Sequence, residues 1–249
     1  MEKTKNSCIS ENDKHIAIHR LSFKAALSGK QTPAFRGAII KAMGEAAHPL
    51  MHNHLDNGLR FAYPMVQYKI IDGCPTILTF GEEGVLLNDF FSKNESFDVS
   101  IRGKNIPCHL QTCKKSDYIP VIDVQPNYYS IADYLPLTDD NVQEYDSLMA
   151  LTDKICLLEK IMTGNILSFF KGIDYHVDEQ IVCVITSIER QHTIKYKGVH
   201  FRAFDMHFVS NVLLPDYIGL GKSTSIGMGT IKRLPLPKEF LKFTTNEKN

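Results

Sequence analysis

The sequence of 249 residues lacks any apolar run of the roughly 18–20 residues that a transmembrane helix needs. Its first residues, MEKTKNSCISENDK, also lack the apolar core of a secretory signal peptide. Charge of neither sign is in excess, because 28 Lys and Arg residues balance 28 Asp and Glu residues. These absences predict a cytoplasmic protein without membrane contact, in which any nucleic-acid binding depends on a local basic patch.

Metal-binding patterns are absent as well. The six cysteines include no CxxC pair, and no cluster of further Cys and His residues beside Cys108 and Cys113 completes a zinc pattern. We expect free thiols in a reducing compartment, several of them buried. The sequence therefore predicts neither a bound metal ion nor a cofactor.

Hydrophobic residues make up 43% of the chain and charged residues 22%, which is typical of a folded protein with one large or two small domains. In the first half, residues 15–25 alternate as a strand does, and Thr32-Pro33 is typical of a helix start. Asp72-Gly73 suits a tight hairpin turn. The order β-α-β-β-α-β that results is the split pattern of a ferredoxin-like domain. The other expected elements are strands at 61–71, 76–80 and 97–102 and helices at about 32–47 and 83–90.

The second half predicts a similar, modified unit. A helical stretch at 141–170, expected to break near Thr152-Asp153, lies between groups of strand-like segments. We therefore predict an α+β protein of two tandem ferredoxin-like (RRM-like) domains with antiparallel sheets. The polar residues 113–117 suggest a division into an N-terminal domain, 1–115, and a C-terminal domain, 116–249. The expected strands of the second half are 118–124, 128–131, 180–188, 193–196, 199–211 and 229–232.

Four glycines surround Lys222 and three hydroxyl residues in the stretch GLGKSTSIGMG, residues 219–229, which we call the glycine-rich loop. Glycine permits positive φ and a close backbone approach, so successive N–H groups can point at one anion. A Walker A loop would need glycine where Asp216 stands, and a dinucleotide fingerprint would need glycine in place of Thr224. We predict a loop that binds a phosphate backbone, with a ligand-free turn as the alternative.

The spacing G-Φ-G-x5-G-Φ-G near the C-terminus, after two ferredoxin-like units, resembles the glycine-rich loop of the CRISPR repeat-processing endoribonucleases of the RAMP superfamily. The stretches FRGAIIKAMGEAAHPLMHNH and YPMVQYKIIDGCPTIL are similar to the N-terminal half of the b-type branch of that family. This resemblance implies a metal-independent cut within the repeat of a CRISPR precursor transcript. The 2′-hydroxyl of the RNA would attack the adjacent phosphate and leave 2′,3′-cyclic phosphate and 5′-hydroxyl ends.

The string HNH at residues 52–54 is the densest group of proton-transfer side chains, and Lys41 and Tyr63 are close in sequence. Such a cut needs a base, an acid and positive charge near the phosphate. Histidines two residues apart in an extended segment point the same way, and histidine titrates near neutral pH. Matching the family's histidine pair gives His54 as the main catalytic residue and His52 as its helper, with Tyr63 and Lys41 as further candidates. Zinc bound by these histidines and His48 is the alternative.

The predicted partner is CRISPR repeat RNA in its precursor transcript, and an effector complex and a homodimer are further partners that the resemblance allows. Two other functions stay open: a non-catalytic RAMP-type subunit that keeps processed RNA, and a small-molecule-binding or structural α+β protein. The residues predicted to contact RNA are Gly219, Gly221, Lys222, Ser223, Gly227, Gly229, Lys232, Arg233 and Arg36.

Overall fold

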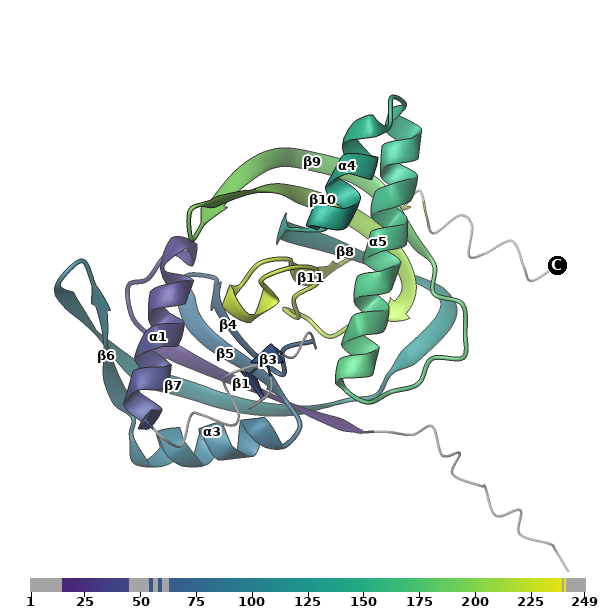
Figure 1. Cartoon of the computed structure of the whole chain (residues 1–249). Coiled ribbons are helices and arrows are strands. Elements are labelled where there is room, and N and C mark those ends of the chain that lie inside the picture. The colour runs from purple at the N-terminus through teal and green to yellow at the C-terminus, as the bar shows by residue number, and fades with distance from the viewer. Residues whose placement is uncertain (1–14, 45–53, 56–57, 60–62, 239, 241–249) are drawn as a thin grey trace, which may run out of the picture.

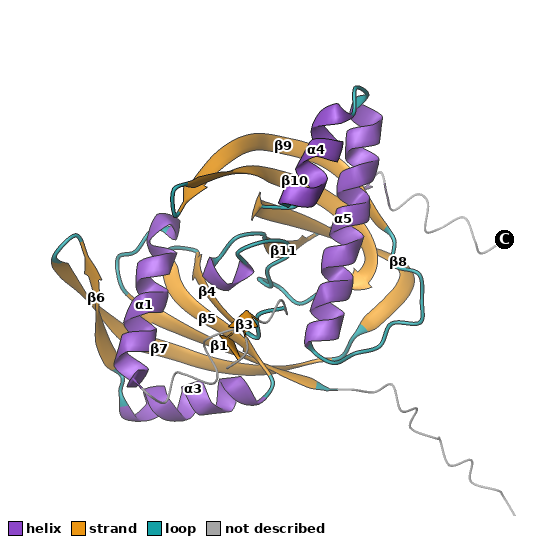
Figure 2. Ribbon diagram, in the orientation of Figure 1, coloured by secondary structure: helices purple, strands orange, loops and turns teal. Residues whose placement is uncertain are grey.

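The computed structural model describes residues 15–44, 54–55, 58–59, 63–238 and 240. Two antiparallel sheets, one from each half of the chain, carry helices at their sides (Figures 1 and 2). A short third pairing joins β2 (His54–Leu55) to β3 (Gly58–Leu59). The α+β class with two antiparallel sheets is therefore confirmed.

The N-terminal sheet has the strand order β4-β5-β1-β7-β6. Its first four strands follow the ferredoxin-like arrangement, in which the first and third strands of the unit are central. The hairpin turn expected at Asp72-Gly73 is present, and both residues have positive φ, 49° and 78°. The strands are β1 (Ile16–Lys24), β4 (Val66–Ile71), β5 (Cys74–Phe80), β6 (Ser96–Ile101) and β7 (Lys104–Tyr118).

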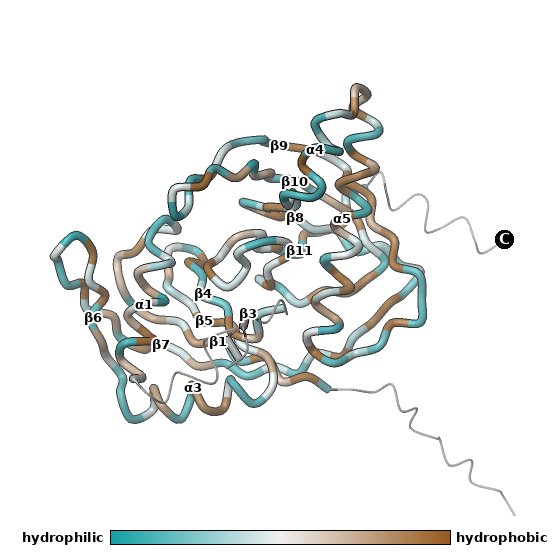
Figure 3. Tube along the Cα trace, in the orientation of Figure 1, coloured by the Kyte–Doolittle hydropathy of each residue, from teal (hydrophilic) through white to brown (hydrophobic). Residues whose placement is uncertain are grey.

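Two helices, α1 (Thr32–Met43) and α3 (Glu82–Lys93), cover one face of this sheet. The predicted apolar stripe of α1 is confirmed, because Phe35, Ile39 and Met43 are buried at helical spacing. Apolar and polar residues also alternate around α3 (Figure 3). Edge-to-face contacts between aromatic rings join the helices to β1 and fix the core of this domain.

Strand β7 is the main departure from the predicted N-terminal domain. Residues 104–118 were not expected as a strand there, and the polar segment 113–117 was expected as the domain boundary. Residues 109–118 instead pair along β1, from Ile16 opposite Tyr118 to Lys24 opposite His109, and residues 104–109 pair with β6. Most side chains of β7 are exposed, so its pairing depends on the β1 backbone rather than on an apolar face of its own.

The C-terminal sheet has the order β11-β8-β10-β9, again with the first and third strands of the unit in the centre. Segments predicted as separate strands join into long ones, because β-bulges absorb the breaks in alternation. The predicted helix is interrupted at residues 148–150 rather than at Thr152-Asp153. The elements are β8 (Val121–Tyr134), α4 (Asp139–Ser147), α5 (Leu151–Gly172), β9 (Cys183–Tyr196), β10 (Val199–Leu213) and β11 (Thr230–Leu234).

Helix α5 joins the two halves. Phe169 of α5 lies 5.2 Å from Tyr63 and 5.7 Å from Phe80, measured between ring centroids, and it also packs against Tyr118. One apolar cluster therefore contains residues of both sheets. Within the described residues, no helix is long and apolar enough to cross a bilayer.

Between β10 and β11, the second helix of a ferredoxin-like unit is missing. The glycine-rich loop takes its place, with one short 3-10 turn, η3 (Thr224–Ile226). In Figure 1 this segment lies between the two sheets, beside β4 and β11. Contacts of η3 with β4 and α1 hold the loop at the junction of the domains.

Candidate nucleic-acid interface

The glycine-rich loop is attached to the N-terminal domain through buried polar side chains of β4. The Gly219 N–H donates to Oε1 of Gln67 at 2.9 Å. Lys69 Nζ donates to the Thr230 hydroxyl at 3.0 Å, and that hydroxyl donates to the Gly227 carbonyl at 2.9 Å. Neither Gln67 nor Lys69 is solvent-exposed. The two domains are therefore connected by hydrogen bonds beneath the loop as well as by the shared core.

Close backbone packing explains why glycine is needed in this loop. Gly221, Gly227 and Gly229 have φ of 87°, 96° and 59°. A Cβ on Gly229 would collide with the carbonyl oxygen of Leu220, and one on Gly221 would lie 2.8 Å from the Leu135 carbonyl oxygen. The glycines thus let the loop fold tightly against its own backbone and against the domain junction.

Most N–H groups of the glycine-rich loop already donate within the protein. Their acceptors are the Gln67 side chain and backbone carbonyls such as those of Asp133 and Leu135. The prediction that successive N–H groups point at one phosphate therefore does not hold for the whole loop. Lys222 extends from it, with Nζ 5.5 Å from the centre of the Phe201 ring, and Ser223 has a left-handed backbone with φ 59°. Contact with a phosphate stays a prediction for these residues. The N–H groups that donate internally belong to Gly219, Leu220, Lys222, Ile226, Gly227, Met228 and Gly229.

Of the predicted histidine pair, the backbone of His54 lies in β2 opposite Leu59, whereas His52 and His48 lie outside the described residues. The geometry of a histidine site is therefore a prediction. Lys41 is exposed in the last turn of α1, immediately before the histidine-bearing segment. The start of this helix contacts the glycine-rich loop, since Thr32 packs against Gly227.

Tyr63 is buried rather than open to solvent, with 8% of its surface exposed. Its hydroxyl lies beside Gln67 and Gly219 without a hydrogen bond of good geometry. Burial raises the pKa of Tyr63 above its usual value. These observations favour a packing role beneath the glycine-rich loop, and a catalytic role stays a prediction.

The predicted cations do not form one patch. Arg36 lies with its guanidinium carbon 6.0 Å from the centre of the Tyr68 ring, on the helix that contacts the loop. Lys232 and Arg233 are both exposed, but neighbouring residues of a strand point to opposite faces. Lys232 and Arg233 therefore lie on opposite faces of the C-terminal sheet.

Sequence patterns missed two further cations. Arg20 lies over the ring of Tyr217 at 4.9 Å, and Lys114 of β7 is directly opposite Arg20 in the sheet. They belong to the sheet face opposite the helices, where Arg20 is half-buried and Lys114 exposed. Only the pairing of β7 with β1 brings them together, and no motif in the sequence marks them.

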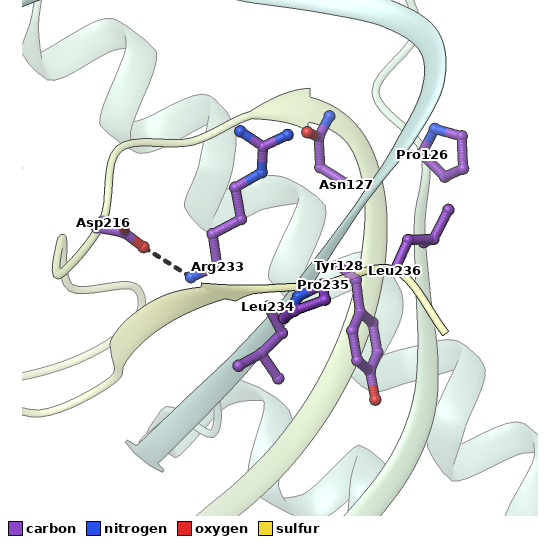
Figure 4. Close-up of a pocket in the computed structure, with 8 residues that line it drawn as sticks. All are labelled: Pro126, Asn127, Tyr128, Asp216, Arg233, Leu234, Pro235 and Leu236. Carbon is purple, nitrogen blue, oxygen red and sulfur yellow. Dashed lines mark hydrogen bonds between the residues drawn. The ribbon is translucent and has the colours of Figure 1, made fainter. Parts of the chain in front are cut away.

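A hollow of about 410 Å³ opens where the end of β11 lies beside the middle of β8 (Figure 4). Arg233 and Asn127 extend into it from one side of the two strands, whereas Tyr128 and Leu234 point to the other side. The Asp216 carboxylate accepts a hydrogen bond from the Arg233 backbone N–H at 2.7 Å. Arg233 therefore lines this hollow, whereas Lys232 belongs to the opposite face of the sheet.

One group of side chains in the described part of the chain has the composition of a metal site. Ligand atoms of Asp133, His192 and Asp205 lie within 4.8 Å of one another. Several of these atoms already contact protein groups: Arg190 pairs with Asp205 at 2.7 Å, and His192 Nε2 contacts Asp133 at 2.8 Å. Nδ1 of His192 is buried without a hydrogen-bond partner among the described residues. These contacts account for the group as an ion-pair network that connects β8, β9 and β10.

Comparison with known families covers nearly all of the described chain. Models of the Cas6b N-terminal domain and the Cas6b C-terminal domain match residues 14–118 and 121–234, respectively. The chain belongs to the Cas6b family. The two matched regions meet between the end of β7 and the start of β8, a few residues after the boundary expected from composition.

Solved structures share the fold of this Cas6b-family chain. A crystal structure of Cas6b has a TM-score of 0.76 at 23% identity, over 89% of this chain and 100% of that one. A structure of the CRISPR RNA processing endoribonuclease Cas6b has a TM-score of 0.67 at 22% identity, with the same coverage. The uncharacterized protein MJ0978 of Methanocaldococcus jannaschii is 37% identical over 107 residues, which are 43% of this chain and 71% of the relative. The predicted RAMP-type, ferredoxin-like fold is confirmed.

Proposed function

We propose that this Cas6b-family chain is an endoribonuclease that cuts CRISPR precursor RNA within the repeat. The observation that carries the proposal is the placement of α1. This helix begins against the glycine-rich loop and ends where the histidine-bearing segment starts.

The proposed chemistry needs only the protein's own side chains. One histidine of the pair His52 and His54 takes the proton from the 2′-hydroxyl, whose oxygen attacks the adjacent phosphorus. The bond from phosphorus to the 5′-oxygen then breaks, and a protonated group supplies the proton to that oxygen. Lys41, exposed at the end of α1, can stabilise the negative charge that develops on the phosphate.

RNA binding would use surfaces on both sides of the junction. Lys222 and Ser223 belong to the glycine-rich loop, and Arg36 lies on the helix that contacts it. On the face of the N-terminal sheet opposite α1 and α3, Arg20 and Lys114 are further candidates for phosphate contacts. Several separated cations suit an RNA that crosses the molecule, and they do not require a net positive chain.

The decisive experiment incubates the full-length protein with end-labelled repeat RNA in the presence of EDTA. We expect a single cut that disappears when the nucleotide at the cut site carries a 2′-deoxy sugar. His54→Ala and His52→Ala should each reduce the single-turnover rate by about 100-fold or more. His176→Ala is the matched control, because this histidine is 88% exposed and lies 3.2 Å from Asp178.

Three outcomes would contradict the proposal. Activity that EDTA abolishes would exclude a metal-independent cut. Full activity of both His52→Ala and His54→Ala would exclude the histidine pair. Tight binding of repeat RNA without cleavage would instead favour a non-catalytic subunit that retains processed RNA.

A further inference from the structure

The hollow beside Arg233 combines one buried amide, two exposed charged side chains and apolar walls. Asn127 is nine-tenths buried, with 9% of its surface exposed, and its side-chain N–H reaches the Gln125 carbonyl only at 3.4 Å. Pro126 and Leu236 lie on the side of the hollow away from Asp216 (Figure 4). Among the described residues, no carboxylate forms an ion pair with the Arg233 guanidinium.

The polar groups of this hollow suit a nucleobase better than a phosphate. The Arg233 guanidinium offers donors only, and the Asp216 carboxylate in the same lining offers acceptors only. A phosphate would be repelled by the carboxylate, whereas the edge of a base presents donors and acceptors together. The apolar wall of Pro126 and Leu236 (Figure 4) provides a surface for the face of the ring.

We propose that this hollow binds one unstacked guanine of the RNA. Its O6 and N7 would accept two hydrogen bonds from the Arg233 guanidinium, and its N1–H and N2–H would donate to the Asp216 carboxylate. Adenine would place its N6 donor against the guanidinium, and pyrimidines lack N7. The inference depends on the proposed function in one respect, namely that the ligand is an RNA chain.

Alternation along β11 supplies a control within the same strand. Lys232 lies next to Arg233 and carries the same charge, but its side chain belongs to the other face of the sheet. It is directly opposite Ser130, whereas Arg233 is opposite Tyr129. Removal of either charge should weaken attraction to phosphates, but only removal of Arg233 should change which base is preferred.

The test measures binding of the full-length protein to oligouridylate heptamers whose central nucleotide is G, A, C or U. Fluorescence anisotropy at fixed salt should show the G oligomer binding about tenfold more tightly than the A oligomer, a discrimination within the range for one bidentate contact. Arg233→Ala should abolish this preference, and Arg233→Lys should not restore it, because an ammonium cannot form the two-pronged contact. Lys232→Ala should weaken binding to all four oligomers and leave the preference intact.

Equal affinity for the G and A oligomers would overturn the inference, as would a preference that survives in Arg233→Ala or no measurable binding of any oligomer. An unchanged melting temperature for Arg233→Ala would show that the exposed side chain acts on recognition and not on folding. Cleavage of repeat RNA without a G preference would overturn the guanine site alone. A G preference without cleavage would contradict only the proposed endoribonuclease.

Discussion

Lys69 of the N-terminal domain donates a hydrogen bond to the Thr230 hydroxyl of the C-terminal domain at 3.0 Å, beneath the glycine-rich loop. The ammonium group is fully buried, and its hydrogen-bond acceptor is a neutral hydroxyl. Desolvation lowers the pKa of Lys69 from 10.5 to about 7. This contact positions the loop through Thr230 and Gly227 while it makes the fold sensitive to pH.

Between pH 7 and 10.5, the unfolded chain holds a proton on Lys69 that the folded chain has released. The free energy of unfolding should therefore rise with pH through this window, by on the order of 4 kcal/mol in total from this group. Lys69→Met should flatten that rise and should be at least as stable as the wild type at pH 7. Urea denaturation at several pH values measures both effects.

Lys195→Met is the control for this pH dependence, because Lys195 is exposed near the end of β9. Its removal should leave the wild-type slope unchanged. An unaltered slope in Lys69→Met would show that Lys69 does not titrate in this window.

Gly229→Ala should destabilise the protein by roughly 2–4 kcal/mol, because a positive φ and a collision with the Leu220 carbonyl act together. Gly198→Ala shares the positive φ, 83°, but its Cβ would meet nothing within 4 Å. This control should lose only about 1–2 kcal/mol. Equal losses in the two variants, measured by thermal unfolding, would argue against tight packing of the loop.

Phe169→Ala should cost about 3–5 kcal/mol, because the ring is fully buried between the two domains. Because the apolar cluster includes residues of both sheets, the wild type should unfold in one cooperative transition followed by calorimetry. Leu167→Ala on the same helix is the control, since Leu167 is 44% exposed and should lose less than about 1 kcal/mol. Two separate transitions in the wild type would contradict a shared core.

Lys222→Ala should weaken RNA binding to all sequences by a similar factor and reduce the slope of log affinity against log salt by about one charge. The physical reason is loss of one phosphate contact beside the glycine-rich loop. Lys154→Ala on α5 provides a control of equal charge, because this lysine lies over the Tyr145 ring of α4 and not over Phe201. A salt slope equal to that of the wild type would place Lys222 outside the RNA path.

The sequence by itself determined most helices, many strands and the two ferredoxin-like units. Alternation in β1 and the stripe of Phe35, Ile39 and Met43 in α1 are local patterns, so their period is visible in one segment. The spacing of the glycines likewise marked the loop that holds the domain junction. From the same local patterns, each of the long strands β8 and β9 was predicted as two short strands, because a β-bulge interrupts alternation without ending the strand.

Only the tertiary structure decided what those segments contact. Strand β7 forms hydrogen bonds with the backbone of β1, and this pairing brings Lys114 opposite Arg20. The burial of Lys69 and Tyr63 depends on a loop more than 150 residues away, which no local pattern records. The hollow beside Arg233 forms where β8 and β11 meet, since a strand's sequence gives alternation but not the neighbour that it faces.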